Sequence, residues 1–210
     1  MKPYRTLFKR AQDEFIVNKS RFIGHACPCE TEEDALAFLS ETRAAHKDAS
    51  HNCYAYIIGA NMGIMRYSDD GEPGGTAGLP IIEVMKARAV TNCALVVTRY
   101  FGGVLLGAGG LVRAYSKGAA AAIDAAGVGE MHPTARYLMD VKYPLLGRIE
   151  RYLASAPAVV EDKTFADVVT LTLIVKNMDE DALVRELIDV AEGDLVPVRF
   201  EEFFHPWSTP

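Results

Sequence analysis

Apolar and polar residues alternate along residues 14–29, a pattern that predicts two antiparallel strands. Asn18-Lys19-Ser20 interrupts the alternation, so a tight turn is expected to join the strands there. Thr31 and the three acidic residues after it then provide an N-cap and an acidic first turn. The helix that they begin is predicted to end near His46.

The next part of the chain predicts strands and helices in alternation. Short strands are expected at residues 53–59 and 64–67, joined by a turn. Apolar residues recur with helical spacing between 79 and 89. Residues 93–97 form a short continuous apolar run, which is typical of a strand buried on both faces. The alanine-rich segment 111–126 predicts a second buried helix.

A domain boundary is predicted at residues 127–133, where two glycines and a proline follow the helix. The chain would then consist of an N-terminal domain, residues 1–131, and a C-terminal domain, residues 132–210. The C-terminal part has the order βαββαβ of a ferredoxin-like domain, and the fold class is therefore α+β. Its elements are expected at 135–142, 145–154, 159–163, 168–175, 179–190 and 195–203.

The composition is that of a globular protein, with 50% hydrophobic and 24% charged residues. The first fifteen residues contain no apolar stretch that could act as a signal peptide, and no window resembles a membrane span. We therefore expect a soluble cytoplasmic protein that does not bind membranes. The four cysteines are expected to be reduced thiols, because the Cys27-Pro28-Cys29 pair lacks the spacing of common zinc sites.

The charge is divided unevenly along the chain. Residues 1–132 contain 14 basic and 14 acidic residues, whereas residues 133–210 contain 8 and 14. The whole net charge of −6 therefore belongs to the C-terminal part. An acidic domain repels a phosphate backbone, so DNA binding is disfavoured and any RNA contact should lie on a local basic patch of the first part.

The first of two glycine-rich segments, residues 68–78, contains four glycines and three carboxylates between a strand and a helix. One interpretation is an acidic surface loop with turn residues. Another is a ligand loop in which the free N–H groups of Gly75 to Gly78 attract an anion at the helix start. The side chains of Asp69, Asp70 and Glu72 are also candidate ligands for Mg²⁺.

The second segment, residues 98–115, combines five glycines with two arginines and two tyrosines. Arg99 ends the central strand, and its guanidinium suits a phosphate or carboxylate ligand. A salt bridge from Arg99 to a carboxylate of the first segment is the structural alternative. Arg113 and Lys117 lie four residues apart on one helical face, where an anion between them would relieve their repulsion.

Known catalytic motifs do not fit these segments. A P-loop requires Lys and Ser/Thr where this chain has Ala108 and Gly109, and Val112 stands in the position of the third Rossmann glycine. The hydrolase and zinc-protease signatures are absent from the sequence. For His46 and His51 we favour a capping or core-edge role over a metal site.

The two segments, SDDGEPGGTAGLPI and VVTRYFGGVLLGAGGLVRAY, together with HKDASHNCYAY at residues 46–56, resemble the signature blocks of the IMPACT family. The similarity is to its bacterial, YigZ-like members and covers nearly the whole chain. The resemblance implies an N-terminal domain with a left-handed βαβ crossover, similar to domain IV of elongation factor G. It also implies a ferredoxin-like C-terminal domain similar to domain V of that factor.

The resemblance further implies a role in translation, because eukaryotic members are translation regulators. Those members carry an additional N-terminal interaction domain that this chain does not show. The resemblance assigns no catalytic residues, metal or cofactor. The family's shared surface, with the neighbouring lysine, corresponds to Asp69, Asp70, Glu72, Gly74, Gly75, Thr76, Arg99, Tyr100, Gly102, Gly103, Gly107, Gly110, Arg113, Tyr115 and Lys117.

Two functions remain open at this stage. The favoured one is a translation-associated regulator that holds RNA or the ribosome through phosphate contacts made by Arg99, Arg113, Lys117 and the glycine loops. The alternative is a Mg-dependent enzyme that acts on a small phosphorylated or nucleotide substrate, with the carboxylates of the first segment as metal ligands or general base.

Overall fold

The computed structural model describes residues 1–207, which fold into two compact units. One unit contains residues 3–130, and the other contains residues 131–207 together with Met1 and Lys2. Both units combine helices with β-sheet, which confirms the α+β class. None of the helices in the described range is long and apolar enough to cross a membrane.

The N-terminal unit is built on a sheet with the strand order β2-β3-β6-β4-β5. The central strand β6 pairs antiparallel with both β3 and β4, so those two strands run parallel to each other and α1 connects them. The handedness of this crossover remains a prediction. The elements are β1 (Tyr4–Leu7), β2 (Ala11–Val17), β3 (Ser20–Pro28), α1 (Glu32–Ala45), β4 (His51–Ile58), β5 (Ile64–Ser68), α2 (Gly78–Ala87), β6 (Cys93–Tyr100) and α3 (Gly107–Ala126).

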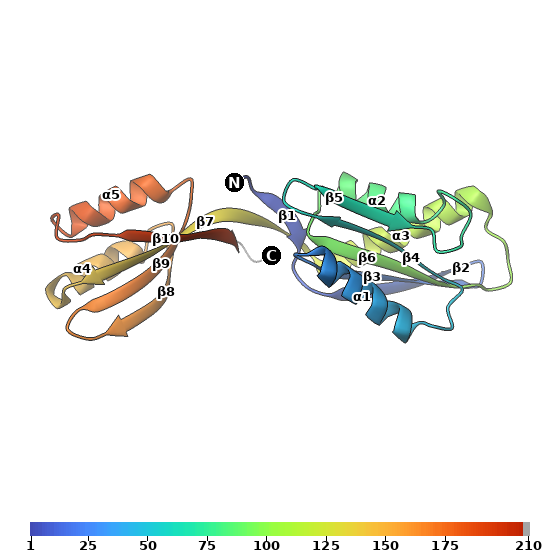
Figure 1. The fold of residues 1–210 in the computed structure, drawn as a ribbon, viewed down its shortest axis with the longest axis horizontal. Coiled ribbons are helices and arrows are strands. Elements are labelled where there is room, and N and C mark those ends of the chain that lie inside the picture. Colours follow the sequence, from blue (N-terminus) through green and yellow to red (C-terminus); the bar gives the residue numbers. More distant parts are fainter. Residues whose placement is uncertain (208–210) are drawn as a thin grey trace. The chain divides into compact units, whose positions relative to one another are not determined.

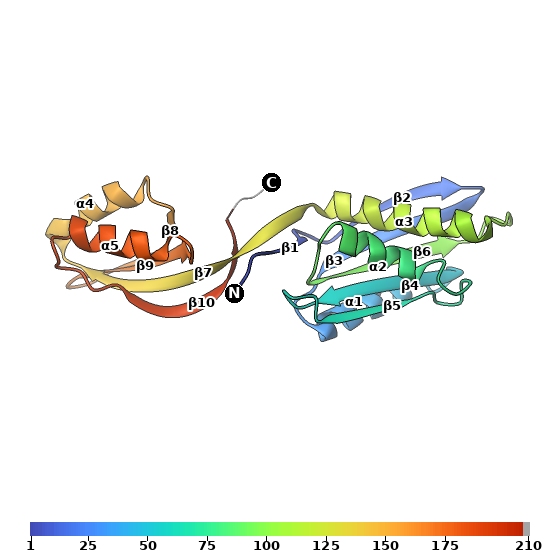
Figure 2. The ribbon, with the colours of Figure 1, turned by 90° about the horizontal axis from the view of Figure 1, so that it is seen from above.

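Helices cover both faces of this sheet (Figures 1 and 2). The α1 face packs around Phe38, Leu39 and Val96, whereas the face covered by α2 and α3 packs around Leu95 and Tyr115. Because β6 is buried on both faces, its alternate residues belong to different cores. The continuous apolar run in the sequence has this origin.

Local sequence explains the first elements. Asn18 and Lys19 form the two-residue turn between β2 and β3, with φ angles of 46° and 67°. Such positive φ values are those of a type I′ turn, which matches the twist of a hairpin. Helix α1 begins with a capping box in which Thr31 and Asp34 each accept a hydrogen bond from the other's backbone N–H.

The C-terminal unit has the predicted order βαββαβ and a fully antiparallel sheet with the strand order β10-β7-β9-β8. This is the ferredoxin-like topology. Helices α4 and α5 pack on one face of that sheet around Ile149, Leu171 and Leu187. The elements are β7 (Val128–Val141), α4 (Tyr143–Leu153), β8 (Ala158–Phe165), β9 (Val169–Lys176), α5 (Glu180–Val190) and β10 (Val198–Pro206).

Three features differ from the sequence prediction. Strand β1, which pairs with β7, was not predicted because it has only four residues. The segment 127–133, predicted as a domain boundary, is mostly the first half of β7, since backbone pairing holds Gly129 and Pro133 in a strand. Helix α3 begins at Gly107 rather than at Leu111, so the second glycine-rich segment is partly helical.

Candidate functional site

The two glycine-rich segments line one cavity of about 480 Å³ in the N-terminal unit. The sheet order creates this arrangement, because His51 on β4 lies opposite Arg99 on β6, and Phe22 on β3 lies opposite Arg99 on the other side. The lining residues are Ser50, His51, Gly71, Glu72, Pro73, Arg99, Phe101, Leu105, Leu106, Gly107, Ala108 and Leu111.

A buried ion pair forms the polar wall of the cavity. Oε1 of Glu72 accepts hydrogen bonds from Nη1 of Arg99 and from the hydroxyl of Tyr115, both at 2.7 Å. Only 3% of the Glu72 side chain and 6% of the Arg99 side chain is exposed. Burial raises the pKa of Tyr115 well above its usual value, so its hydroxyl remains a donor to the carboxylate.

Arg99 therefore has a protein partner in this structure, and its role as a phosphate ligand stays a prediction. Its guanidinium lies 5.5 Å from the ring centre of Phe22 and 5.2 Å from that of Phe101, and Nη2 donates to Ser20 at 3.4 Å. Its Nε has no partner among the described residues. The structural alternative was right: Arg99 pairs with Glu72 and fixes the first segment against the sheet.

His51 is a functional candidate that the sequence analysis set aside. Its Nδ1 lies 2.8 Å from the carbonyl oxygen of Asp70, and a carbonyl can only accept, so Nδ1 carries the proton. In the neutral ring, Nε2 then has a free lone pair. This nitrogen lies 3.9 Å from Oε2 of Glu72 at the wall of the cavity.

The start of α2 is not an open anion site, which corrects the ligand-loop interpretation of the first segment. Oδ1 of Asp69 accepts hydrogen bonds from the amides of Ala77 at 3.0 Å and Gly78 at 2.8 Å, and its Oδ2 accepts from Gly75 at 2.8 Å. The amide of Thr76 donates to the carbonyl oxygen of residue 73. The chain's own carboxylate thus occupies the position predicted for a ligand.

The three acidic side chains of the first segment do not form a common metal site. Asp69 caps α2, and Glu72 pairs with Arg99. Asp70 accepts from the amide of Asn52 at 2.6 Å. Within the described residues no group of three metal-binding side chains is found. A magnesium site that uses Asp69, Asp70 and Glu72 together is not supported by these separate engagements.

The start of α3 differs from the start of α2. No side chain of the described residues caps it, and its first turn contains no acidic residue. Nη1 of Arg113 lies 3.6 Å from where a β-carbon of Gly109 would be, so the guanidinium reaches back over this turn. Lys117, one turn further along, lies over the ring of Phe15 at 4.4 Å. Both cationic side chains are exposed.

Tyr100 belongs to the opposite face of the sheet, because it follows Arg99 on the same strand. Its hydroxyl lies 2.9 Å from Nδ1 of His46, at the end of α1. The ring of His46 lies 4.9 Å from that of His25. Burial, with His46 as a smaller cause, lowers the pKa of His25 to about 4. The sequence did not indicate this histidine pair, since its members belong to β3 and the end of α1.

Glycine is favoured at three positions of the second segment. A β-carbon on Gly102 would lie 2.0 Å from the carbonyl carbon of Lys19, so the loop touches the hairpin turn. Gly103 and Gly107 have φ angles of 81° and 69°, a region that favours glycine. Three predicted residues remain. Thr76 donates to the carbonyl of Pro73 at 2.6 Å. A β-carbon on Gly74 would meet open space, and one on Gly110 would lie 3.0 Å from Cβ of Leu106.

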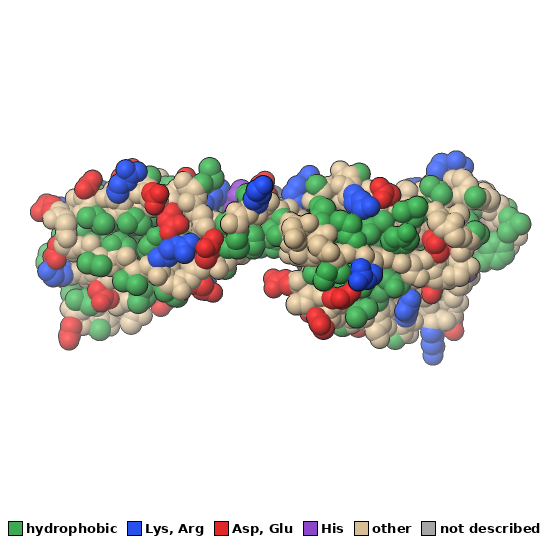
Figure 3. All heavy atoms as spheres, turned by 45° about the horizontal axis from the view of Figure 1, so that its top comes forward, with side chains coloured by type: hydrophobic (Ala, Val, Ile, Leu, Met, Phe, Trp, Pro, Cys, Tyr) green, Lys and Arg blue, Asp and Glu red, His purple; other side chains and the backbone are tan. Residues whose placement is uncertain are grey.

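Large apolar side chains are exposed where the loop between β6 and α3 passes the cavity. The exposed fractions are 48% for Phe101, 39% for Val104 and 84% for Leu105. Figure 3 shows hydrophobic side chains at the end of the N-terminal unit where Figure 1 draws this loop. The entrance of the cavity is thus apolar, and its inner wall is polar.

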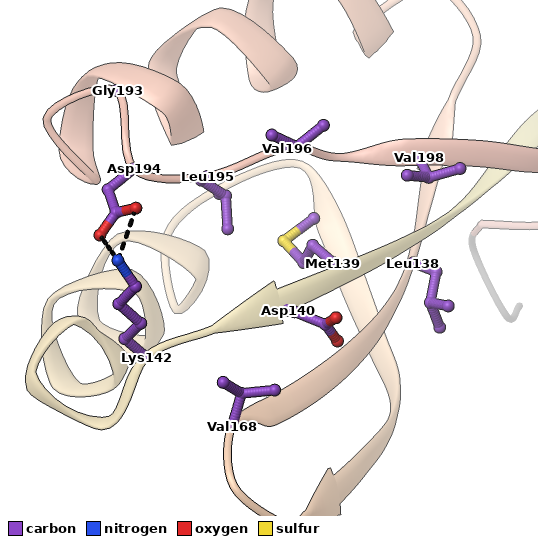
Figure 4. Close-up of a pocket in the computed structure, with 10 residues that line it drawn as sticks. All are labelled: Leu138, Met139, Asp140, Lys142, Val168, Gly193, Asp194, Leu195, Val196 and Val198. Carbon is purple, nitrogen blue, oxygen red and sulfur yellow. Dashed lines mark hydrogen bonds and ion pairs between the residues drawn. The ribbon is translucent and has the colours of Figure 1, made fainter.

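The C-terminal unit contains a separate cavity of about 400 Å³ (Figure 4). It forms where the chain before Val198 diverges from β7, with Met139 and Leu195 at its wall. Nζ of Lys142 donates to both oxygens of Asp194, at 2.9 and 2.6 Å, and closes one end. Asp140, the third charged residue of this wall, accepts a hydrogen bond from the hydroxyl of Thr170 at 2.7 Å.

The four cysteines, predicted to be reduced, are free thiols and are buried. Nε of Arg10 lies 3.0 Å from the sulfur of Cys27. A hydrogen bond with Cys29 is the main cause that lowers the pKa of Cys27 to about 7, and Arg10 adds to it. These residues belong to the α1 face of the sheet, away from the cavity.

Family models match both parts of the chain. Residues 18–123 match the Impact N-terminal domain, and residues 139–193 match a domain of unknown function, DUF1949. The "IMPACT family member YvyE" of Bacillus subtilis (strain 168) is 36% identical over 190 residues, which are 90% of this chain and 88% of that protein. The "IMPACT family member YigZ" of Escherichia coli (strain K12) is 34% identical over 188 residues, 89% of this chain and 92% of that protein.

Similarity to a eukaryotic relative is confined to part of the chain. "Protein IMPACT" of Oryctolagus cuniculus is 34% identical over 94 residues, which are 42% of this chain and 29% of that protein. A solved structure described as "Crystal structure of an hypothetical protein" has a TM-score of 0.62 and 31% identity, and covers 96% of this chain and 98% of its own.

Proposed function

Because this chain belongs to the IMPACT family, we propose that it is a translation-associated protein that binds RNA at the start of α3. In this proposal the amides of the first α3 turn and the cations Lys19, Arg113 and Lys117 contact phosphate oxygens. Backbone N–H groups at helix starts and basic side chains are the usual phosphate ligands in protein–nucleic acid complexes. The binding would be local and moderate, since the unit as a whole is nearly neutral.

The uncapped start of α3 beneath Arg113 is the observation that carries this proposal. The other two helices of the unit that flank the sheet have internal acceptors at their starts, namely Asp34 for α1 and Asp69 for α2. The start of α3 has neither a capping side chain within the described range nor an acidic first turn. Its amides and two nearby cations therefore favour an external anion.

Lys19 extends this surface to the turn between β2 and β3. Its backbone lies against Gly102 of the second glycine-rich segment, and its side chain is exposed. Neighbouring phosphates of one strand could thus be contacted by the turn and by the helix. The enzyme alternative is less well supported, because the carboxylates that would hold Mg²⁺ already have protein partners.

The test compares two charge-matched variants in filter binding to a single-stranded RNA of mixed sequence. Arg113→Ala with Lys117→Ala is expected to weaken binding about tenfold and to reduce the slope of log affinity against log salt by about 1. Lys86→Ala with Arg88→Ala removes the same charge at the C-terminal end of α2 in the same unit, where both side chains are paired with carboxylates. Equal losses in the two variants, or no salt-dependent binding by the wild type, would refute the proposal.

A further inference from the structure

Two hydrogen-bond acceptors stand side by side at the inner wall of the 480 Å³ cavity. Oε1 of Glu72 already accepts from Arg99 and Tyr115, but Oε2 has no hydrogen-bond donor among the described residues. In the neutral ring Nε2 of His51 is the second acceptor, because the carbonyl of Asp70 fixes the single proton on Nδ1. The two acceptor atoms are 3.9 Å apart. A ligand that satisfies both must present two neighbouring donors.

The charge of the wall favours a neutral ligand. Arg99 already pairs with Glu72 at 2.7 Å, so a second cation would gain little attraction and would be repelled by the guanidinium. An anion would face the carboxylate oxygen and the imidazole lone pair, both of which repel it. Neutral N–H groups are the donors that fit this wall.

The rest of the cavity favours a flat, largely apolar ligand. Pro73, Leu106 and Leu111 line it, and Phe101 at the rim is 48% exposed. The buried Arg99 guanidinium lies 5.2 Å from the Phe101 ring and supports that ring from inside the protein, which leaves the ring as the stacking surface. The volume lies in the range of about 300–1,000 Å³ that is usual for small-molecule sites.

We infer that this cavity binds a guanine base. Among the common bases, guanine alone presents two adjacent donors on its Watson–Crick edge, N1–H and the exocyclic N2 amine, whereas adenine, cytosine and uracil each present a single donor group there. The amine and N1–H face Glu72 and His51, and the ring stacks at Phe101. The base comes either from a free guanine nucleoside or from an unpaired guanosine of RNA.

The cavity adjoins the phosphate surface at Gly107 and Ala108, but the groups that would hold the base are Glu72, His51 and Phe101, so the inference goes beyond the proposed function. Calorimetric titration with guanosine, inosine and adenosine tests it directly. Inosine lacks the exocyclic amine and is expected to bind at least about tenfold more weakly than guanosine, because one acceptor stays unpaired. Adenosine, with an acceptor at N1, is expected to bind more weakly still. Equal affinities for guanosine and adenosine, or no guanosine binding up to its solubility limit, overturn the inference.

Two variants locate the binding in this cavity. Glu72→Gln replaces the carboxylate by an amide of the same shape and is expected to abolish the preference for guanosine over inosine. Ala108→Trp places a large side chain at an exposed position of the rim, leaves the ion pair in place, and is expected to abolish guanosine binding in a folded protein. Guanosine binding that survives in folded Ala108→Trp overturns the assignment to this cavity.

Competition between guanosine and short single-stranded RNA identifies the source of the base. If an RNA with one guanosine displaces guanosine and the same RNA with adenosine does not, the ligand is an RNA base. If neither RNA competes, the site serves a free nucleoside or nucleotide. The variant Arg113→Ala with Lys117→Ala should keep guanosine binding. Failure of the RNA-binding proposal can therefore be distinguished from failure of the guanine inference.

Discussion

Glu72 and Arg99 show how a buried ion pair constrains a glycine-rich segment. Both side chains are more than nine-tenths buried, and Tyr115 donates a second hydrogen bond to the same carboxylate oxygen. Burial of a charge pair costs much desolvation energy, which is offset only when the geometry and the additional hydrogen bonds are good. The pair therefore fixes the position of the first segment more than it adds net stability.

Removal of one partner of this pair should be far more harmful than removal of both. Glu72→Ala is expected to lower the free energy of unfolding by about 3–5 kcal/mol, because the Arg99 charge stays buried without compensation. Glu72→Leu combined with Arg99→Met should recover most of that loss. Urea unfolding of Glu72→Leu, Arg99→Met and the double variant measures the coupling energy between the two side chains. Additive losses in the double variant would show that the two charges do not interact.

His25 makes the stability of the N-terminal unit sensitive to acid. Its ring is buried and its pKa is lowered from 6.5 to about 4, so the unfolded chain binds a proton more readily than the folded one. The stabilisation is complete above pH 6.5 and is lost as the pH falls from 6.5 towards 4. The expected slope in this window is about 1 kcal/mol per pH unit.

Urea unfolding of the wild type and of His25→Asn between pH 7.5 and 4 measures this contribution. The variant should be less stable at neutral pH but should lose less stability than the wild type on acidification. His205→Asn, a substitution in the C-terminal unit, should keep the wild-type slope. Identical slopes in the wild type and His25→Asn would assign the acid sensitivity to other groups.

At the scale of elements, α2 and α3 share a glycine-rich entry but begin in different ways. Asp69 satisfies three amides at the start of α2, so that end is closed by the chain itself. The start of α3 has no such acceptor in the described part of the chain. The difference matters because the first four amides of a helix need partners from outside its own turns.

Asp69→Ala is therefore expected to lower the free energy of unfolding by about 1–2 kcal/mol through loss of the cap. Asp69→Asn should retain part of the stabilisation, since its amide oxygen can still accept from the α2 amides but carries no charge. Asp48→Ala, at an exposed position after α1, serves as the control and should change stability by less than about 0.5 kcal/mol. A loss in Asp69→Ala no larger than that of Asp48→Ala would contradict the capping role.

At the scale of the whole molecule, the uneven distribution of charge limits the electrostatic attraction between the protein and RNA. All of the net charge of −6 belongs to residues 133–210, and the three cations of the proposed surface belong to the neutral first part. Long-range attraction to a phosphate chain is therefore weak, and binding depends on local contacts.

A small dependence on salt follows from this count of cations. With three phosphate contacts, the slope of log affinity against log salt for single-stranded RNA should be about −2. Fluorescence anisotropy of a labelled RNA would measure this slope between about 50 and 300 mM salt, a range that includes the physiological ionic strength of about 0.15 M. A slope steeper than about −5 would require many more contacts than this surface offers.

The sequence by itself determined the elements whose causes lie within a few neighbouring residues. The hairpin turn at Asn18 and Lys19, the capping box of Thr31 and Asp34, and the βαββαβ order of the C-terminal part all follow from local spacing and backbone preference. The errors of the sequence prediction are also local. Strand β1 is too short to show an alternating pattern, and glycines predicted as a loop form the first turn of α3.

Only the tertiary structure decided which side chains of the site remain free. The sequence identified both glycine-rich segments, and they line one cavity, but it could not show that Asp69 fills the α2 start or that Glu72 neutralises Arg99 across 27 positions. It also passed over His51, which the pairing of β4 with β6 brings opposite Arg99. Such partners are selected by strand order and by the cost of burying an unpaired charge, and neither is encoded in the spacing of neighbouring residues.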